Sequence, residues 1–212
     1  MDHYGVPSEK INVVHNAVDF SSHYYDENFE IKKTDRVVLF LGRVTLQKGP
    51  DYFVYAAKKV LEHEKDIKFI VAGSGDMEPF VIEKAAELGI ADRVLFAGFL
   101  NPDDVERAYK MADIYVMPSV SEPFGITALE AMKFKTPSIV SKQSGVSEVI
   151  RHSLKVDFWD INEISNKIIA LLRYSPLHET LKESGYSEVK KINWDVPAEK
   201  CICVYNDLIG KG

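Results

Sequence analysis

Short apolar segments alternate with helical patterns along most of the chain. From Arg36 onward, the predicted buried strands are Val37–Leu41, Ile67–Ala72, Val94–Phe96, Ile114–Met117 and Ser138–Val140. Between the first two strands, apolar residues recur at the three- and four-residue spacing of one buried helix face, at Tyr52, Phe53, Ala56, Ala57, Val60 and Leu61. This alternation predicts parallel strands joined by crossover helices, that is, a doubly wound, Rossmann-like α/β sheet.

The turns after the strands are the expected ligand sites, because doubly wound sheets bind ligands beyond the carboxyl ends of their strands. The first turn contains Gly42, Arg43, Lys48 and Gly49. Two cations beside glycines can converge on one polyanion, and each charge-assisted hydrogen bond to phosphate is worth roughly 1.5–3 kcal/mol. We therefore predict that Arg43 and Lys48 neutralise a diphosphate without a metal. The alternative is that both are solvated loop charges.

The second and third strands are followed by Gly73-Ser74-Gly75 and by Phe99-Leu100. A lone G-x-G is a weak signal of dinucleotide binding. Gly73 and Gly75 are predicted to form a tight turn whose backbone approaches the ligand, with an ordinary turn as the alternative. Phe99 and Leu100 are predicted to form a flat apolar wall for a base, whereas the alternative places them in the core.

The fourth strand is followed by two glutamates eight positions apart, Glu122 and Glu130, and the segment leads into a helix predicted over Thr127–Lys133. Pro123 suits the first turn of that helix, and Gly125 lets a ligand approach the backbone closely. Free N–H groups at the helix start form an anion site. The glutamates are predicted to accept hydrogen bonds from sugar hydroxyls. The alternative is a capped helix whose acidic residues complement its dipole.

Composition narrows the class of protein. The 212 residues favour one domain, and a net charge of −6 without a lysine-rich segment disfavours nucleic acid as a partner. Cys201 and Cys203 are interpreted as core thiols in a reducing compartment. A cytoplasmic, soluble protein is expected, since no apolar stretch approaches about 18 residues and residues 1–30 lack the features of a signal peptide. No metal or cofactor motif is present, so neither is expected.

In combination, these motifs resemble the donor-binding half of family 4 GT-B glycosyltransferases, which transfer sugars from nucleotide donors with retention of configuration. The matching residues are Gly42-Arg43 with Lys48-Gly49, Gly73-Ser74-Gly75, and Glu122-Pro123-Phe124-Gly125 through Glu130. Tyr4–Pro7 and Ile11–Asp19 look like the segment that leads into this half. The last helix, after Trp194, looks like the closing helix of the family. It has an apolar stripe that is expected to be partly exposed.

The resemblance implies a role for each matching residue. Arg43 and Lys48 would hold the donor diphosphate, and the amides of Phe124–Ile126 would contact sugar and phosphate. Glu122 would face the donor sugar, and Glu130 would bind the ribose hydroxyls. Four departures from the family pattern affect the outer loops, and with them sugar preference, at Ala17, Ser144, Ser147 and Ser153.

The family has two Rossmann-like domains, with the acceptor site in the N-terminal one. This chain resembles only the second. We expect one domain over residues 1–212, with a lead-in segment over 1–35, a Rossmann-like core over 36–190 and a crossover helix over 191–212. The expected partners are a nucleotide sugar and the N-terminal acceptor domain, with peripheral membrane association through that domain as a further expectation.

The expected function is therefore the donor-binding domain of a retaining, metal-independent glycosyltransferase of the hexosyltransferase type, inactive on its own. The donor would be a UDP-, GDP- or ADP-sugar. The catalytic residues would be Arg43, Lys48 and Glu122: the cations and the helix amides would stabilise charge on the departing diphosphate, and Glu122 would orient the sugar. The alternatives are a nucleotide-sugar epimerase or phosphorylase of the same fold, and a non-catalytic nucleotide-sugar-binding module.

Overall fold

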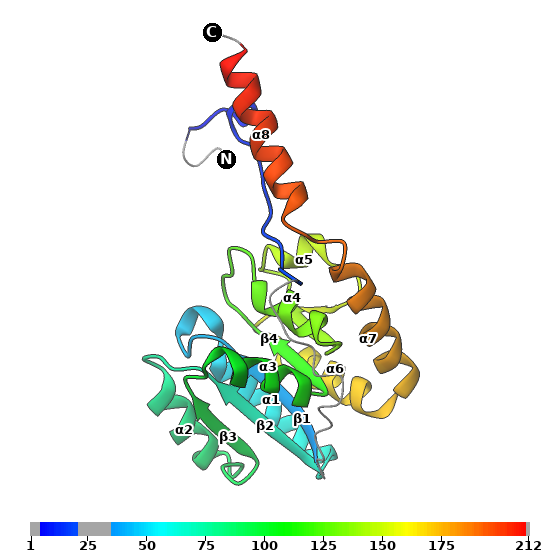
Figure 1. Cartoon of the computed structure of the whole chain (residues 1–212). Helices are drawn as coiled ribbons and strands as arrows, with labels where there is room; N and C mark the ends of the chain where they lie inside the picture. The colour runs from blue at the N-terminus through cyan, green and yellow to red at the C-terminus, as the bar shows by residue number, and fades with distance from the viewer. Residues whose placement is uncertain (1–4, 21–34, 211–212) are drawn as a thin grey trace.

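The strands form one parallel sheet in a computed structural model that describes residues 5–20 and 35–210. The strand order is β3-β2-β1-β4-β5-β6, so the direction of winding reverses between β1 and β4. The strands are β1 (Arg36–Leu41), β2 (Ile67–Ala72), β3 (Val94–Gly98), β4 (Ile114–Met117), β5 (Ser138–Ser141) and β6 (Leu154–Val156). The predicted doubly wound α/β sheet is confirmed (Figure 1).

Helices lie in the connections between consecutive strands, as crossovers between parallel strands require, and further helices precede β1 and follow β6. They are η2 (Ser8–Lys10), η3 (Leu46–Lys48), α1 (Pro50–His63), α2 (Glu78–Glu87), α3 (Pro102–Met111), α4 (Ile126–Lys133), α5 (Val146–Val149), α6 (Ile161–Arg173), α7 (Ser175–Val189) and α8 (Asp195–Ile209). The start of α3 shows how local residues favour the beginning of a helix. Pro102 occupies its first turn, and the side chain of Asn101 accepts a hydrogen bond from the Asp104 amide at 3.0 Å.

Each face of the sheet has its own hydrophobic core. On one face, α1, α2 and α6 cover the strands, and the ring of Phe53 lies 5.7 Å from those of Phe40 and Phe69, centroid to centroid. On the other face, α3 and α4 enclose Tyr109 and Tyr115, whose ring centroids lie 5.8 Å apart. Because both faces are packed, the carboxyl ends of the strands are held in fixed positions. The predicted site residues follow those ends.

The observed elements differ from the predicted ones at several points, and β1 and β5 are each one residue longer than predicted. β3 continues to Gly98, two residues beyond the predicted end. β6 was not predicted, since it has only three residues with Lys155 in the middle, and it becomes a strand by pairing with β5. α4 begins at Ile126, so Pro123 lies before the helix and not in its first turn.

The last helix, α8, projects from the body of the domain and runs beside the N-terminal segment (Figure 1). None of its residues is buried, so the interpretation of Cys201 and Cys203 as core thiols is wrong. The expected exposure of its apolar stripe is confirmed, from 55% at Ile202 to 78% at Ile209. Tyr4 and residues 211–212 lie outside the described residues, as does much of the predicted lead-in segment. Within residues 5–20 and 35–210, no helix has the length and hydrophobicity that a membrane span requires.

Candidate functional site

The loops after β1 and β2 pack backbone against backbone. Gly73 has a φ of 125°, and a Cβ atom there would lie 1.9 Å from the carbonyl oxygen of Gly42. A Cβ on Gly75 would lie 2.2 Å from the carbonyl oxygen of Val44. Loop packing therefore requires both glycines. Gly42, by contrast, has open space where its Cβ would lie, so it leaves room for a ligand to approach the backbone.

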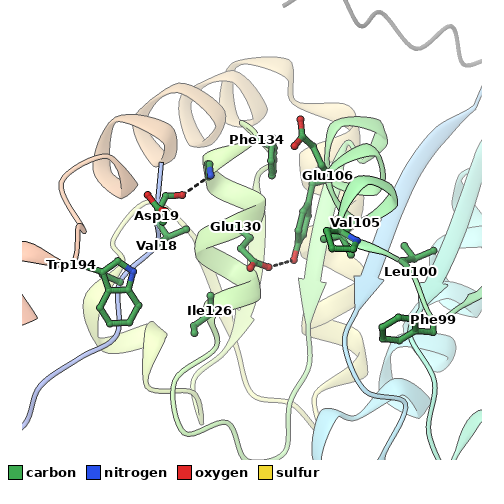
Figure 2. Close-up of a pocket in the computed structure, with 14 residues that line it drawn as sticks. Val18, Asp19, Phe99, Leu100, Val105, Glu106, Ile126, Glu130, Phe134 and Trp194 are labelled. Carbon is green, nitrogen blue, oxygen red and sulfur yellow. Dashed lines mark hydrogen bonds between the residues drawn. The ribbon is translucent and has the colours of Figure 1, made fainter. Parts of the chain in front are cut away.

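Two neighbouring cavities open at this edge of the sheet. The smaller, about 340 Å³, is lined by Leu41, Gly42, Arg43, Ala72, Gly73, Ser74, Phe99, Leu100 and Val105. The larger, about 460 Å³, lies between α3, α4, residues 17–19 and Trp194, and it is drawn in Figure 2. The two share Phe99, Leu100 and Val105, so they form one groove. Volumes of this size are typical of small-molecule sites. Gly75 does not line either cavity.

Phe99 and Leu100 form the junction of this groove. The Phe99 residue is 83% exposed, so the alternative that places it in the core is wrong. Leu100 is half-buried and packs against the core on the α3 and α4 face. The pair thus presents an apolar surface held by the core on one side and open on the other, which is the geometry a planar base needs for stacking.

Glu130 lies in the wall of the larger cavity, within α4 (Figure 2). Its carboxylate accepts a hydrogen bond of 2.9 Å from the hydroxyl of Tyr109, a fully buried side chain of α3. Burial raises the pKa of Tyr109 well above its usual value, and electrostatic interactions with Tyr115 and Glu130 raise it further. The phenol therefore stays protonated and fixes one oxygen of Glu130. This orienting role of Tyr109 was not predicted from the sequence.

Lys48 and Glu122 form an ion pair. Their side chains are only 20% and 8% exposed, so water screens the pair weakly. Arg43 is exposed and donates a hydrogen bond of 3.1 Å to the side-chain oxygen of Gln47. The two cations of the loop thus hold different partners in this structure. Their convergence on one diphosphate stays a prediction.

The start of α4 carries free backbone donors. Gly125 is the N-cap, with a φ of 107°, and no side chain caps the helix. Among the described residues, none accepts a hydrogen bond from the amides of Gly125, Ile126 or Thr127. The capped-helix alternative is wrong, because Glu122 precedes the helix and pairs with Lys48, while Glu130 lies in its interior. The open amides remain available for an anion.

The loop between β5 and α5 holds Glu122 in place through the backbone. The Glu122 amide donates to the Gln143 carbonyl at 3.3 Å, and the Gly145 amide donates to the Glu122 carbonyl at 3.1 Å. A Cβ on Gly145 would lie 2.3 Å from the Pro123 carbonyl oxygen, so a glycine is needed there. The Ser144 hydroxyl is satisfied within its own loop by the Ser141 carbonyl at 2.6 Å. No local pattern in the sequence indicates these contacts.

The charged groups that line the groove are the side chains of lysine, arginine, aspartate and glutamate. Among the described residues, no group of three or more His, Cys, Asp or Glu side chains is placed to hold a metal ion. Arg43 and Lys133 line the groove, whereas Lys48 pairs with Glu122 and lines neither cavity. Binding without a metal stays a prediction that a titration can test.

The parallel sheet and its two helical layers define an α/β domain of the GT-B type, with a groove at the carboxyl edge of the sheet. Over residues 24–188 the sequence matches the family described as "Glycosyl transferases group 1". The chain belongs to this family, and the resemblance found from the sequence motifs is thereby confirmed. The match establishes a glycosyltransferase family and leaves donor, acceptor and stereochemistry to be proposed.

Relatives and solved structures agree with this assignment. An uncharacterized glycosyltransferase of Methanocaldococcus jannaschii is 33% identical over 95% of this chain and 55% of its own length. The solved C-terminal domain of a glycosyl transferase group 1 family protein from Francisella tularensis, LpcC, is 26% identical with a TM-score of 0.69, covering 84% of this chain and 95% of that domain. Anabaena HepE, solved with UDP-glucose, is 18% identical with a TM-score of 0.73, covering 81% and 49% of the two chains. The chain spans about half the length of the curated relatives it matches.

Proposed function

We propose that this domain binds the nucleotide-diphosphate sugar that a retaining, metal-independent glycosyltransferase uses as its donor. One observation carries the proposal: the groove runs from Phe99 past Glu130 to Ile126 at the start of α4, and Glu122, which pairs with Lys48, lies four residues before that helix start. A base, a ribose, a diphosphate and a sugar find suitable groups in that order. The UDP-glucose complex of HepE, a protein of the same fold, supports this ligand class.

Each part of the donor has a place in the proposal. The base stacks on Phe99 and Leu100, and the ribose hydroxyls donate to Glu130, whose other hydrogen bond comes from Tyr109. The diphosphate meets Lys48, Arg43 and the amides at the start of α4, where the helix dipole favours negative charge. The sugar lies against Glu122, whose carboxylate accepts from its hydroxyls. UDP-, GDP- and ADP-sugars all meet these requirements.

The ion pair of Lys48 and Glu122 suggests how the donor is recognised as a whole. A diphosphate alone would draw Lys48 away from Glu122 and leave a poorly solvated carboxylate without its cation, which is costly. A nucleotide sugar would offer the anion to Lys48 and hydroxyl donors to Glu122 together. As the bond between sugar and diphosphate breaks, charge grows on the diphosphate, and Lys48 and the amides stabilise it most at that point.

The complete enzyme would need a second domain for the acceptor. The half-length match to the curated relatives and the likeness to an isolated C-terminal domain of LpcC support this division. We propose that the 212 residues bind donor without transferring its sugar, and that an N-terminal acceptor domain completes the active site. The half-length match also favours a second candidate, a non-catalytic nucleotide-sugar-binding module.

The test is a calorimetric titration of the domain with UDP, GDP, ADP and their hexose conjugates, in buffer with EDTA and then with magnesium. Saturable binding of one nucleotide in EDTA is expected. Binding that needs magnesium would contradict metal independence, and no binding of any nucleotide would contradict the proposal. Incubation of the bound conjugate, followed by NMR, separates the rivals: an epimerase inverts a sugar carbon without an acceptor, whereas a binding module leaves the donor unchanged even when an acceptor domain is present.

A further inference from the structure

Lys133 is a buried cation in the wall of the larger cavity. It lies three residues after Glu130 in α4, and only 2% of the residue is exposed. Its ammonium donates to the backbone carbonyl of Asp19 at 2.6 Å, the bond drawn from the labelled Asp19 in Figure 2. The ammonium also lies 5.3 Å and 5.7 Å from the ring centroids of Phe20 and Phe134. A lysine so placed joins α4 to a segment more than a hundred residues earlier in the chain.

That segment, residues 17–19, forms the wall of the cavity opposite α3. Among the described residues, it belongs to no helix or strand, so no backbone ladder holds it in place. Ala17 and Val18 are buried, and the Val18 amide donates to the Ile192 carbonyl at 3.3 Å. Together with the bond from Lys133, these contacts dock the segment on the domain. Glu130 lies between this wall and α3 (Figure 2).

A buried ammonium is costly, and an apolar side chain with the same stem would fill the space at less cost. Burial lowers the pKa of Lys133, while the charges of Asp19, Glu106 and Glu130 oppose that change. The contacts of the ammonium with the Asp19 carbonyl and with the nearby carboxylates therefore offset the cost of burying it. The backbone carbonyl of Asp19 accepts one hydrogen bond from the ammonium, and Asp19 also lines the cavity.

We propose that Lys133 is a positioning residue that couples nucleotide binding to docking of residues 17–19. This inference rests on the proposed function of the groove. The larger cavity has both walls only when the segment is docked, so a nucleotide that touches both walls binds the docked form. By linkage, bound nucleotide stabilises docking to the same degree that docking improves affinity. Lys133 supplies the hydrogen bond that favours the docked form.

The experiment uses the 212-residue chain and two matched variants, Lys133→Met and Lys110→Met. Met keeps the length of the stem and removes the cation. Lys110 is a suitable control because its ammonium also lies over the Phe134 ring, at 5.9 Å, while its ion pair is with Glu106. Affinity for UDP, GDP and ADP is measured by calorimetry, and hydrogen exchange is followed in the peptide over residues 14–20, with and without nucleotide.

Lys133→Met is expected to lose roughly tenfold in affinity, as loss of one charge-assisted hydrogen bond implies, and to exchange faster over residues 14–20. Nucleotide should slow exchange there in the wild-type chain and less so in the variant. Lys110→Met should behave like wild type. Unchanged affinity in Lys133→Met, or an equal loss in Lys110→Met, would overturn the inference.

The two proposals fail in different ways. If the wild-type chain binds no nucleotide, the proposed function fails, yet the exchange rates of the free proteins still report whether Lys133 docks the segment. A Lys133→Arg variant, which keeps a cationic donor, provides a second measurement if Lys133→Met does not fold. Arginine should retain slow exchange over residues 14–20, and exchange as fast as in an undocked segment would contradict the role of the donor.

Discussion

Lys48 and Glu122 act as one electrostatic unit, although 74 positions separate them in the sequence. Removing one partner of a poorly solvated pair leaves the other without its counter-charge, and this costs more than the pair itself contributes. A single substitution at either position therefore changes two properties at once. The double variant Lys48→Ala/Glu122→Gln separates them, because it removes both charges together.

Lys48→Ala is expected to weaken binding of nucleoside diphosphate by tenfold or more, on the order of 1.5–3 kcal/mol for a charge-assisted bond. The unpaired carboxylate of Glu122 should repel the diphosphate further, so the double variant should bind better than Lys48→Ala. Calorimetry measures both. Lys68→Ala serves as the control, since Lys68 lies near the start of β2 and contacts the Asp92 carbonyl. Affinity of Lys48→Ala equal to that of the control would contradict the assignment.

Substitutions of Glu130 and of Glu122 are expected to affect the binding of different ligands. Glu130→Gln should cost affinity for plain nucleoside diphosphates, because the ribose loses a charged acceptor and the Tyr109 hydroxyl loses its anionic partner. Glu122→Gln should not weaken binding of plain diphosphates, because it removes the carboxylate that competes with them for Lys48, but it should weaken binding of the nucleotide sugar. Titrating both variants with a diphosphate and with its hexose conjugate tests this division. Equal losses for both ligands in both variants would show that the two roles are not distinct.

At the scale of elements, the end of α4 holds an unusual residue. The Lys135 amide donates to the Met132 carbonyl at 3.0 Å and the Thr136 amide to the Ala131 carbonyl at 2.9 Å, the two bonds of a Schellman motif. That motif requires a residue in the left-handed backbone conformation. Lys135 adopts it with a φ of 59°, where glycine is favoured. The side chain offsets this cost, since its ammonium reaches Glu183 of α7 at 3.0 Å and lies 5.1 Å from the centroid of the Tyr186 ring.

Replacement of Lys135 should therefore distinguish backbone strain from side-chain contacts. Lys135→Ala loses the contacts and keeps the strained φ, whereas Lys135→Gly loses the contacts and relieves the strain. The glycine variant should be the more stable of the two by about 1 kcal/mol in urea unfolding at equilibrium. An alanine variant as stable as the glycine variant would show that the left-handed conformation costs nothing at this position.

At the scale of the whole molecule, the groove lies on the packed body of the domain, whereas α8 has no buried residue. The sheet and its two cores hold the groove, while α8 leaves the body with an exposed apolar stripe that ends at Leu208 and Ile209. Exposed apolar patches of this kind are typical of surfaces that meet another domain. This agrees with the proposal that an acceptor domain completes the enzyme.

The whole-molecule prediction is that the 212 residues bind donor and transfer no sugar. Radiolabelled nucleotide sugars are incubated with the chain and candidate acceptors, first alone and then with an N-terminal acceptor domain from a full-length relative. Transfer should appear only in the second reaction. Efficient transfer by the chain alone would place the acceptor site within these residues and contradict the two-domain arrangement.

The sequence by itself determined most of the elements, because the period of apolar residues reflects which face each strand or helix buries. Ile67–Ala72 and Ile114–Met117 were predicted with the boundaries that the structure shows. It also identified residues that line the groove, such as Phe99 and Glu130, since parallel strands gather their following turns at one edge. β6 was not predicted because its three residues are too few to show a repeating pattern of apolar positions.

Only the tertiary structure decided which of these residues meet. The pairing of Lys48 with Glu122 depends on β1 lying beside β4, and no local pattern encodes that order. Gly73 and Gly75 proved to be packing positions because a second loop lies where their Cβ atoms would be. The bonds from Tyr109 to Glu130 and from Lys133 to Asp19 likewise join separate elements. Spacing along a chain reports local burial, whereas contacts between distant residues arise only once the sheet has set the order of its strands.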